Sequence, residues 1–77
     1  MKYISTVKDL NTALRNFLNN AKCGDTLEIV IDTSNEYLLT HIPKYTLSYQ
    51  LSLIDIRRDG NYYVAIIIKR FGKGCRE

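Results

Sequence analysis

The sequence predicts an α+β two-layer sandwich in which two helices cover one face of a mixed four-stranded sheet. Two segments carry apolar residues at helical spacing, and four shorter ones alternate or concentrate apolar residues as strands do. Their order along the chain is β-α-β-α-β-β. The pair Asp59-Gly60 separates the last two strands and is a strong signal for a hairpin. With 77 residues the chain has room for one domain, residues 1–77.

A short strand over residues 2–5 leads into the first helix. Thr6, with Asp9 three residues later, matches the Ser/Thr-x-x-acid pattern that caps a helix N-terminus. Apolar side chains then recur at helical spacing, at Val7, Leu10, Leu14, Phe17, Leu18 and Ala21. Gly24 is expected to end the helix in the left-handed conformation that glycine adopts readily.

The middle of the chain predicts a strand followed by a second helix. Residues 26–33 read TLEIVIDT, with one strongly apolar face formed by Leu27, Ile29 and Ile31. Beyond this strand we expect a loop or a single turn as far as His41. Pro43 fits badly in a helix interior but well at a first helical position, so the second helix is expected to begin at Pro43.

Residues 51–58 and 61–70 are predicted to form the last two strands, on either side of the hairpin turn. Helical crossovers join parallel strands with a right-handed connection, so the first three strands should be parallel. The hairpin then makes the fourth strand antiparallel to the third. We expect residues 71–77 to form a mobile tail.

Composition and charge exclude several function classes. The longest apolar run, residues 62–68, is far shorter than the roughly 20 residues of a membrane helix, and we expect a cytoplasmic protein. His41 is the only histidine, and the two cysteines lack the paired spacing of a zinc site, so we expect no metal and no cofactor. The formal net charge of +3 permits an anionic partner and also fits ordinary solubility.

Four short motifs, in their order and spacing, carry a resemblance that covers nearly the whole chain. They are Gly24-Asp25, Ile42-Pro43, Gly60 and Lys69-Arg70. Together they resemble the TusA-like (SirA-type) sulfur-carrier domain. The resemblance implies the sheet order 1-2-4-3 and partners that approach the hairpin end. The segment before Ile42 is somewhat longer than is usual in that family.

One departure from the family matters more than the matches. The family carries a persulfide on the cysteine of a Cys-Pro-x-Pro motif at the start of the first helix. A thiolate is favoured there because the helix dipole and free N–H groups lower the cysteine pKa. In this chain the motif falls on residues 7–10, where Val7 replaces the cysteine and both prolines are absent. We therefore expect no catalytic residue, and a sulfurtransferase is disfavoured.

Cys23 and Cys75 form a candidate thiol pair. A helix of about 15 residues would separate Cys23 from the family's persulfide position by roughly 20 Å. The implied strand order brings the end of the last strand beside the start of the second, within reach of Cys75. A disulfide would then contribute roughly 4 kcal/mol by the chain-entropy model. The alternatives are two free thiols, which the rarity of cytosolic disulfides favours, and a Cys75 that accepts sulfur itself.

The hairpin end of the domain is a candidate site for an anion or an acidic partner. Both predicted helix N-termini point their free N–H groups toward this end. The nearby basic residues are Lys8, His41, Arg57 and Arg58.

The sheet face without helices is a second candidate surface. We expect it to expose an apolar patch of Tyr63, Ile67 and Val30. Such a patch suggests a homodimer or a protein partner.

Three functions follow from these features. The first is a TusA-like domain without the carrier cysteine, acting as a non-catalytic protein-binding or regulatory module linked to sulfur relay or redox. The second is a sulfur carrier or redox protein that uses Cys75 with Cys23. The third is weak nucleic-acid binding through the basic C-terminal end, residues 69–76.

Overall fold

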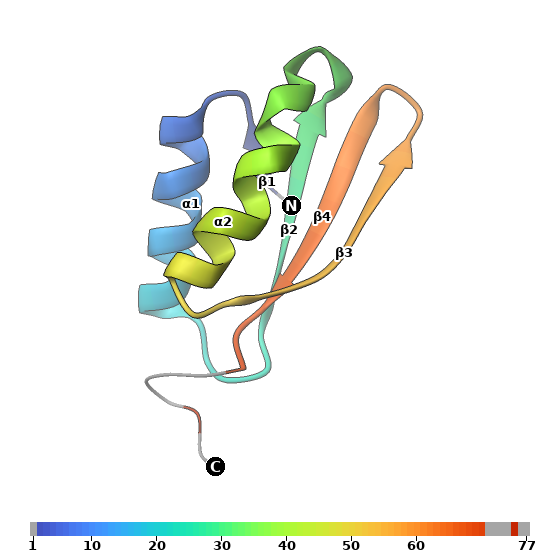
Figure 1. The fold of residues 1–77 in the computed structure, drawn as a ribbon. Coiled ribbons are helices and arrows are strands. Elements are labelled where there is room, and N and C mark those ends of the chain that lie inside the picture. Colours follow the sequence, from blue (N-terminus) through green and yellow to red (C-terminus); the bar gives the residue numbers. More distant parts are fainter. Residues whose placement is uncertain (1, 71–74, 76–77) are drawn as a thin grey trace.

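Four strands form one mixed sheet in the order β1-β2-β4-β3, and both α-helices lie on the same face of it (Figure 1). The computed structural model describes residues 2–70 and Cys75. The elements are β1 (Lys2–Ile4), α1 (Val7–Asn20), β2 (Thr26–Asp32), the 3₁₀ segment η1 (Thr33–Thr40), α2 (His41–Ser48), β3 (Ser52–Asp59) and β4 (Tyr62–Ile68). The predicted fold class is confirmed, including the strand order that the resemblance implied. The predicted mobile tail lies outside the described residues, apart from Cys75.

The core lies between the helices and one face of the sheet. β1 pairs in parallel with β2, while β4 runs antiparallel to both β2 and β3. These pairings align the apolar face predicted for β2 with apolar residues of the neighbouring strands. The buried cluster consists of Ile4, Leu10, Ala13, Leu14, Ile29, Ile31, Leu38, Ile42, Leu51, Ala65 and Ile67.

The sheet face turned away from the helices differs from the prediction. Ile67 is fully buried in the core and Tyr63 packs against it, so their expected exposure on this face is wrong. Val30 does lie on the open face, opposite Val64 on β4, but it is buried there, so its expected exposure is also wrong. Because β4 is apolar on both sides, its own sequence does not say which side faces the helices. The pairing register with β2 decides it.

Thr6 caps α1 as predicted. Its hydroxyl oxygen accepts a hydrogen bond from the Asp9 N–H at 3.0 Å. The Asp9 carboxylate reaches one residue further back, where it accepts bonds from the Ser5 hydroxyl (3.1 Å) and the Ser5 N–H (3.4 Å). These bonds fix the turn from β1 into α1.

The C-terminus of α1 is capped by Lys69, the residue directly after β4, rather than by the predicted glycine. The helix ends at Asn20, and Ala21 is already extended, so the expectation for Gly24 is wrong. The Lys69 ammonium donates to the carbonyl groups of Leu18 (3.1 Å) and Ala21 (2.9 Å). Lys69 is only 3% exposed, and its charge lies at the negative end of the helix dipole.

Gly24 belongs instead to a tight turn between α1 and β2. The Asp25 N–H donates to the Lys22 carbonyl at 3.0 Å, and the Asp25 carboxylate accepts from the Lys22 N–H at 2.8 Å. Gly24 has a φ of +96° at the third position of this turn, which glycine adopts readily. Bonds from Gly24 N–H to the Lys69 carbonyl (2.8 Å) and from Lys69 N–H to the Asp25 carbonyl (3.1 Å) attach the turn to β4.

α2 begins at His41, two residues before the predicted start, and the predicted loop before it is the 3₁₀ segment η1. The Asp32 carboxylate accepts a hydrogen bond from the Ser34 N–H at 2.9 Å. This bond caps the helical turns that begin directly after β2. These turns continue into α2, because Thr40 is itself helical. Pro43 is the third residue of α2, where an N–H has no intrahelical partner and proline is tolerated.

Gln50 ends α2 in a left-handed conformation, with a φ of +59°. The Gln50 N–H donates to the Leu47 carbonyl (3.0 Å) and the Leu51 N–H to the Thr46 carbonyl (2.8 Å). This is the Schellman arrangement, in which glycine is the preferred residue at the position of Gln50.

Replacing Gln50 by glycine should raise the free energy of unfolding by about 1 kcal/mol. The left-handed conformation costs an L-residue roughly 1–2 kcal/mol, and the greater freedom of glycine in the unfolded chain offsets part of the gain. Urea denaturation followed by circular dichroism measures the change. The control Ser48→Gly, at the last residue of α2, should instead lower stability by about 0.5 kcal/mol. A less stable Gln50→Gly protein would contradict the assignment.

Replacing Lys69 by methionine should lower the free energy of unfolding by about 1–3 kcal/mol. Methionine keeps an apolar stem of similar length but leaves the two helix carbonyl groups without their donor. The same denaturation experiment applies. Arg70→Met is the matched control: Arg70 is exposed, and its change should stay within about 0.5 kcal/mol. Equal effects of the two substitutions would show that Lys69 does not cap α1.

Candidate functional site

A disulfide joins Cys23 to Cys75, which are 52 residues apart in the sequence and 5.0 Å apart between Cα atoms. Cys23 is the second residue of the turn 22–25, which is hydrogen-bonded to Lys69 just after β4. The chain beyond β4 therefore starts close to Cys23. Of the alternatives for the thiols, the structure has the bonded pair and not two free thiols, because the antiparallel pairing of β2 and β4 returns the chain to this turn.

The surroundings of the disulfide stabilise a thiolate poorly. The Cys23 sulfur lies 3.8 Å from the Arg70 carbonyl oxygen, and the Cys75 sulfur 3.9 Å from the Lys69 carbonyl oxygen. Cys23 also follows the C-terminus of α1, the negative end of the helix dipole. The buried ammonium of Lys69 is directed at helix carbonyl groups instead of sulfur. This environment favours a structural bond over a nucleophile, although Cys23 itself is exposed.

The opposite end of α1 holds no thiol. Val7 is its first helical residue and packs against the core. The 14 residues of α1 place it about 21 Å from the end of the helix that leads to Cys23 (Figure 1). The carboxylate of Asp9 lies in the first turn at this end. A second anion would be repelled there, so this end does not suit anionic sulfur.

The four basic residues predicted at the hairpin end are not gathered into one site. Arg57 and Arg58 are consecutive on β3 and therefore point to opposite faces of the sheet. The Arg58 Nε donates to the Gly60 carbonyl at 3.2 Å, which holds this side chain against its own hairpin. Lys8 is exposed on the first turn of α1. His41 lies at the start of α2, whose N-terminus is not free because η1 runs into it.

Three aromatic rings form a row along η1 and α2 that the sequence analysis missed. Tyr37 meets His41 edge-on with ring centroids 6.4 Å apart, and His41 stacks on Tyr45 at 6.0 Å. The Tyr37 hydroxyl also donates to the Ser5 carbonyl at 3.5 Å, which connects η1 to the start of α1. Tyr37, His41 and Tyr45 are four residues apart in the sequence, and this spacing indicates neighbouring side chains on a helix. It could be recognised only if helical structure were expected before His41.

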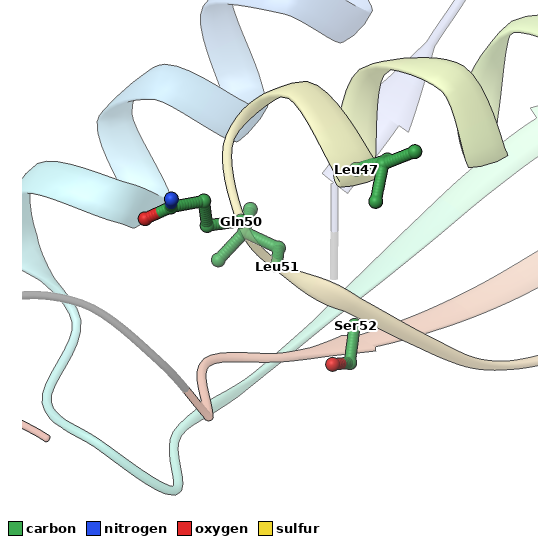
Figure 2. Close-up of a pocket in the computed structure, with 4 residues that line it drawn as sticks. All are labelled: Leu47, Gln50, Leu51 and Ser52. Carbon is green, nitrogen blue, oxygen red and sulfur yellow. The ribbon is translucent and has the colours of Figure 1, made fainter. Parts of the chain in front are cut away.

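A shallow pocket of about 390 Å³ lies where α2 meets β3 (Figure 2). It is lined by Leu47, Gln50, Leu51 and Ser52, and Leu47 is 78% exposed. Ser52 contributes a hydroxyl, but none of the other three side chains is an acid or a base that could activate it. The pocket can receive an aliphatic group but offers no catalytic chemistry.

Comparison with known proteins gives no match: no protein-family model, curated protein or solved structure matches this chain. Among residues 2–70 and Cys75, no group of three or more His, Cys, Asp or Glu side chains could hold a metal ion. Within the same residues, no helix has both the length and the apolar character needed to cross a membrane.

Replacing Cys75 by serine should lower the free energy of unfolding by about 4 kcal/mol. The disulfide closes a 52-residue loop, and the chain-entropy model gives this value for a loop of that length. Urea denaturation without reductant measures the loss. The reduced wild-type protein is the matched control and should unfold at nearly the same urea concentration as the variant. Equal stability of the oxidised wild type and the variant would contradict a stabilising bond.

Proposed function

We propose that this protein is a TusA/SirA-like domain that lacks the carrier cysteine and acts as a non-catalytic protein-binding or regulatory module linked to sulfur relay or redox. The observation that carries the proposal is the position of the sulfur atoms. Cys23 and Cys75 are bonded to each other beyond the C-terminus of α1, whereas the family's sulfur position at its N-terminus is Val7. The strand order, which agrees with the order implied by the resemblance, supports the family assignment.

The electrostatics of the two ends of α1 support a non-catalytic role. A carrier thiol needs the N-terminal end of a helix, where N–H groups stabilise the thiolate. In this chain the N-terminal end holds Val7 and the carboxylate of Asp9, and the sulfur atoms lie near carbonyl groups at the other end. Neither end combines a thiol with groups that activate it.

A second candidate function uses the same disulfide as a redox centre. Cys23 is exposed, so a thiol of another molecule can reach its sulfur. Attack there would form a mixed disulfide with Cys23 and release Cys75 as the leaving thiolate. The surrounding carbonyl groups disfavour that thiolate, and we therefore place this function second.

Nucleic-acid binding through the basic C-terminal end is weaker than the sequence suggested. Lys69 is the first residue of the proposed basic segment, 69–76, and the Lys69 ammonium is buried at the end of α1. We also propose a cytoplasmic location. Reductants in the cytosol keep most thiols reduced, and lasting disulfides are unusual there outside hyperthermophiles. If the protein is cytoplasmic, its disulfide must therefore resist reduction by these reductants.

The experiment that tests the proposal measures thiol state and sulfur loading by alkylation and intact mass. The purified protein should show no reactive thiol before reduction and two afterwards. Incubation of either form with a cysteine desulfurase and L-cysteine should add no sulfur, because no thiol is activated.

The variants Cys23→Ser and Cys75→Ser form the matched pair for this experiment. Each keeps one thiol, and neither should acquire a persulfide. Sulfur added only where Cys75 remains would establish the second candidate function and overturn the first.

A further inference from the structure

The sheet face turned away from the helices carries a regular arrangement of charge. In two rows across the sheet, an apolar residue of β4 lies between two acidic residues: Asp32-Tyr62-Asp59 and Glu28-Ile66-Asp55. The row between these two is Val30-Val64-Arg57. The acids therefore form two acidic borders, Glu28 with Asp32 on β2 and Asp55 with Asp59 on β3, and β4 is the apolar strip between them.

Sheet geometry sets the dimensions of this surface. Neighbouring strands are about 4.8 Å apart, so the acidic borders on β2 and β3 are about 10 Å apart. The two acids within each border are four residues apart, a distance of about 13 Å along the strand. The strip between them is the seven-residue strand β4, roughly 23 Å long.

Two tyrosine rings form the outer surface at one end of the apolar strip. Tyr3 on β1 and Tyr62 on β4 meet edge-on across β2, with ring centroids 6.2 Å apart. Val30 and Val64 are only 5% and 7% exposed, whereas Tyr3 and Tyr62 are 67% and 42% exposed. A partner would therefore meet aromatic rings first, and exposed aromatic rings are frequent binding anchors.

The charge of this face is opposite to that of the chain. Of the residues that the structure describes, four of the seven acidic and one of the nine basic residues lie on it, which gives this face a formal charge of −3, whereas the formal net charge of the chain is +3. Hydrogen bonds from the Ser34 backbone and side chain lower the pKa of Asp32, which favours the ionised form of this carboxylate. A phosphate backbone or an anionic membrane would be repelled. A second copy packed face to face would bring acidic borders together.

We propose that this face binds a basic amphipathic α-helix of a partner protein, which lies along β4 between the two acidic borders. This inference rests on the proposed function as a protein-binding module and names the chemistry of its partner. An α-helix is about 10–12 Å wide with its side chains, which matches the spacing of the borders. Its apolar stripe would cover the β4 strip, and basic residues on both sides of the stripe would meet the acids. Basic side chains near the tyrosine rings would add cation–π contacts.

The test uses the full chain and a synthetic helical peptide of about 15 residues, with leucine on one face and lysine on the other. Titration followed by NMR should shift the amide signals of β4 and the acidic borders, and the affinity should fall as salt is added. An otherwise identical peptide with glutamate in place of lysine should not bind. Shifts confined to α1 and α2, or no binding of the lysine peptide, would overturn the proposal.

Charge reversal provides the matched variants. Asp55→Lys, which reverses one exposed acid of the β3 border, should weaken binding of the lysine peptide fivefold or more. Glu36→Lys, which reverses an exposed acid on η1, should change it less than twofold. Equal weakening by both changes would mean that only net charge matters, and a stable dimer formed through this face would overturn the proposal. Sulfur loading is measured separately, so a failed peptide titration leaves the proposed function standing, while a persulfide overturns that function alone.

Discussion

The buried ammonium of Lys69 holds together the end of the domain where α1, β2 and β4 meet. A cation that is 3% exposed is stable only if its donors are satisfied, and the carbonyl groups of Leu18 and Ala21 provide this. The same two carbonyl groups are left without intrahelical partners when α1 ends. The Lys69 side chain therefore satisfies both its own buried ammonium and the carbonyl groups at the end of α1, so the helix can end without a glycine cap.

The backbone of Lys69 extends this junction to the disulfide. Its N–H and carbonyl bond to Asp25 and Gly24, which fixes the turn that carries Cys23 against the end of β4. These hydrogen bonds hold Cys23 beside the end of β4, where the chain that leads to Cys75 begins. In this arrangement the disulfide adds covalent closure to a junction that hydrogen bonds also hold, and such closure matters most where the hydrophobic core is small.

The features that sequence predicts well are those with a local physical cause. Alternation predicted the strands, and Thr6 predicted the start of α1, because a side-chain cap is formed within a few residues. The exposed sheet face was predicted wrongly because β4 is apolar on both sides and only its pairing with β2 separates them. Lys69 had a partial signal: it continues the alternation of Tyr63, Ala65 and Ile67, the side of β4 that faces the helices. The left-handed conformation of Gln50 had no signal in the sequence, because glycine is the usual residue at such a position.

The charges at the two ends of α1 explain why the Cys23–Cys75 disulfide is suited to a structural role and not to catalysis. A helix stabilises negative charge at its N-terminus and positive charge at its C-terminus. This chain places a carboxylate, Asp9, at the first end and an ammonium, Lys69, at the second, so the dipole is satisfied at both ends by charges of the protein itself. A carrier domain instead leaves the first end free for a thiolate. With both ends occupied, the open sheet face still combines four acidic side chains with the exposed rings of Tyr3 and Tyr62, and binding specificity is best sought there.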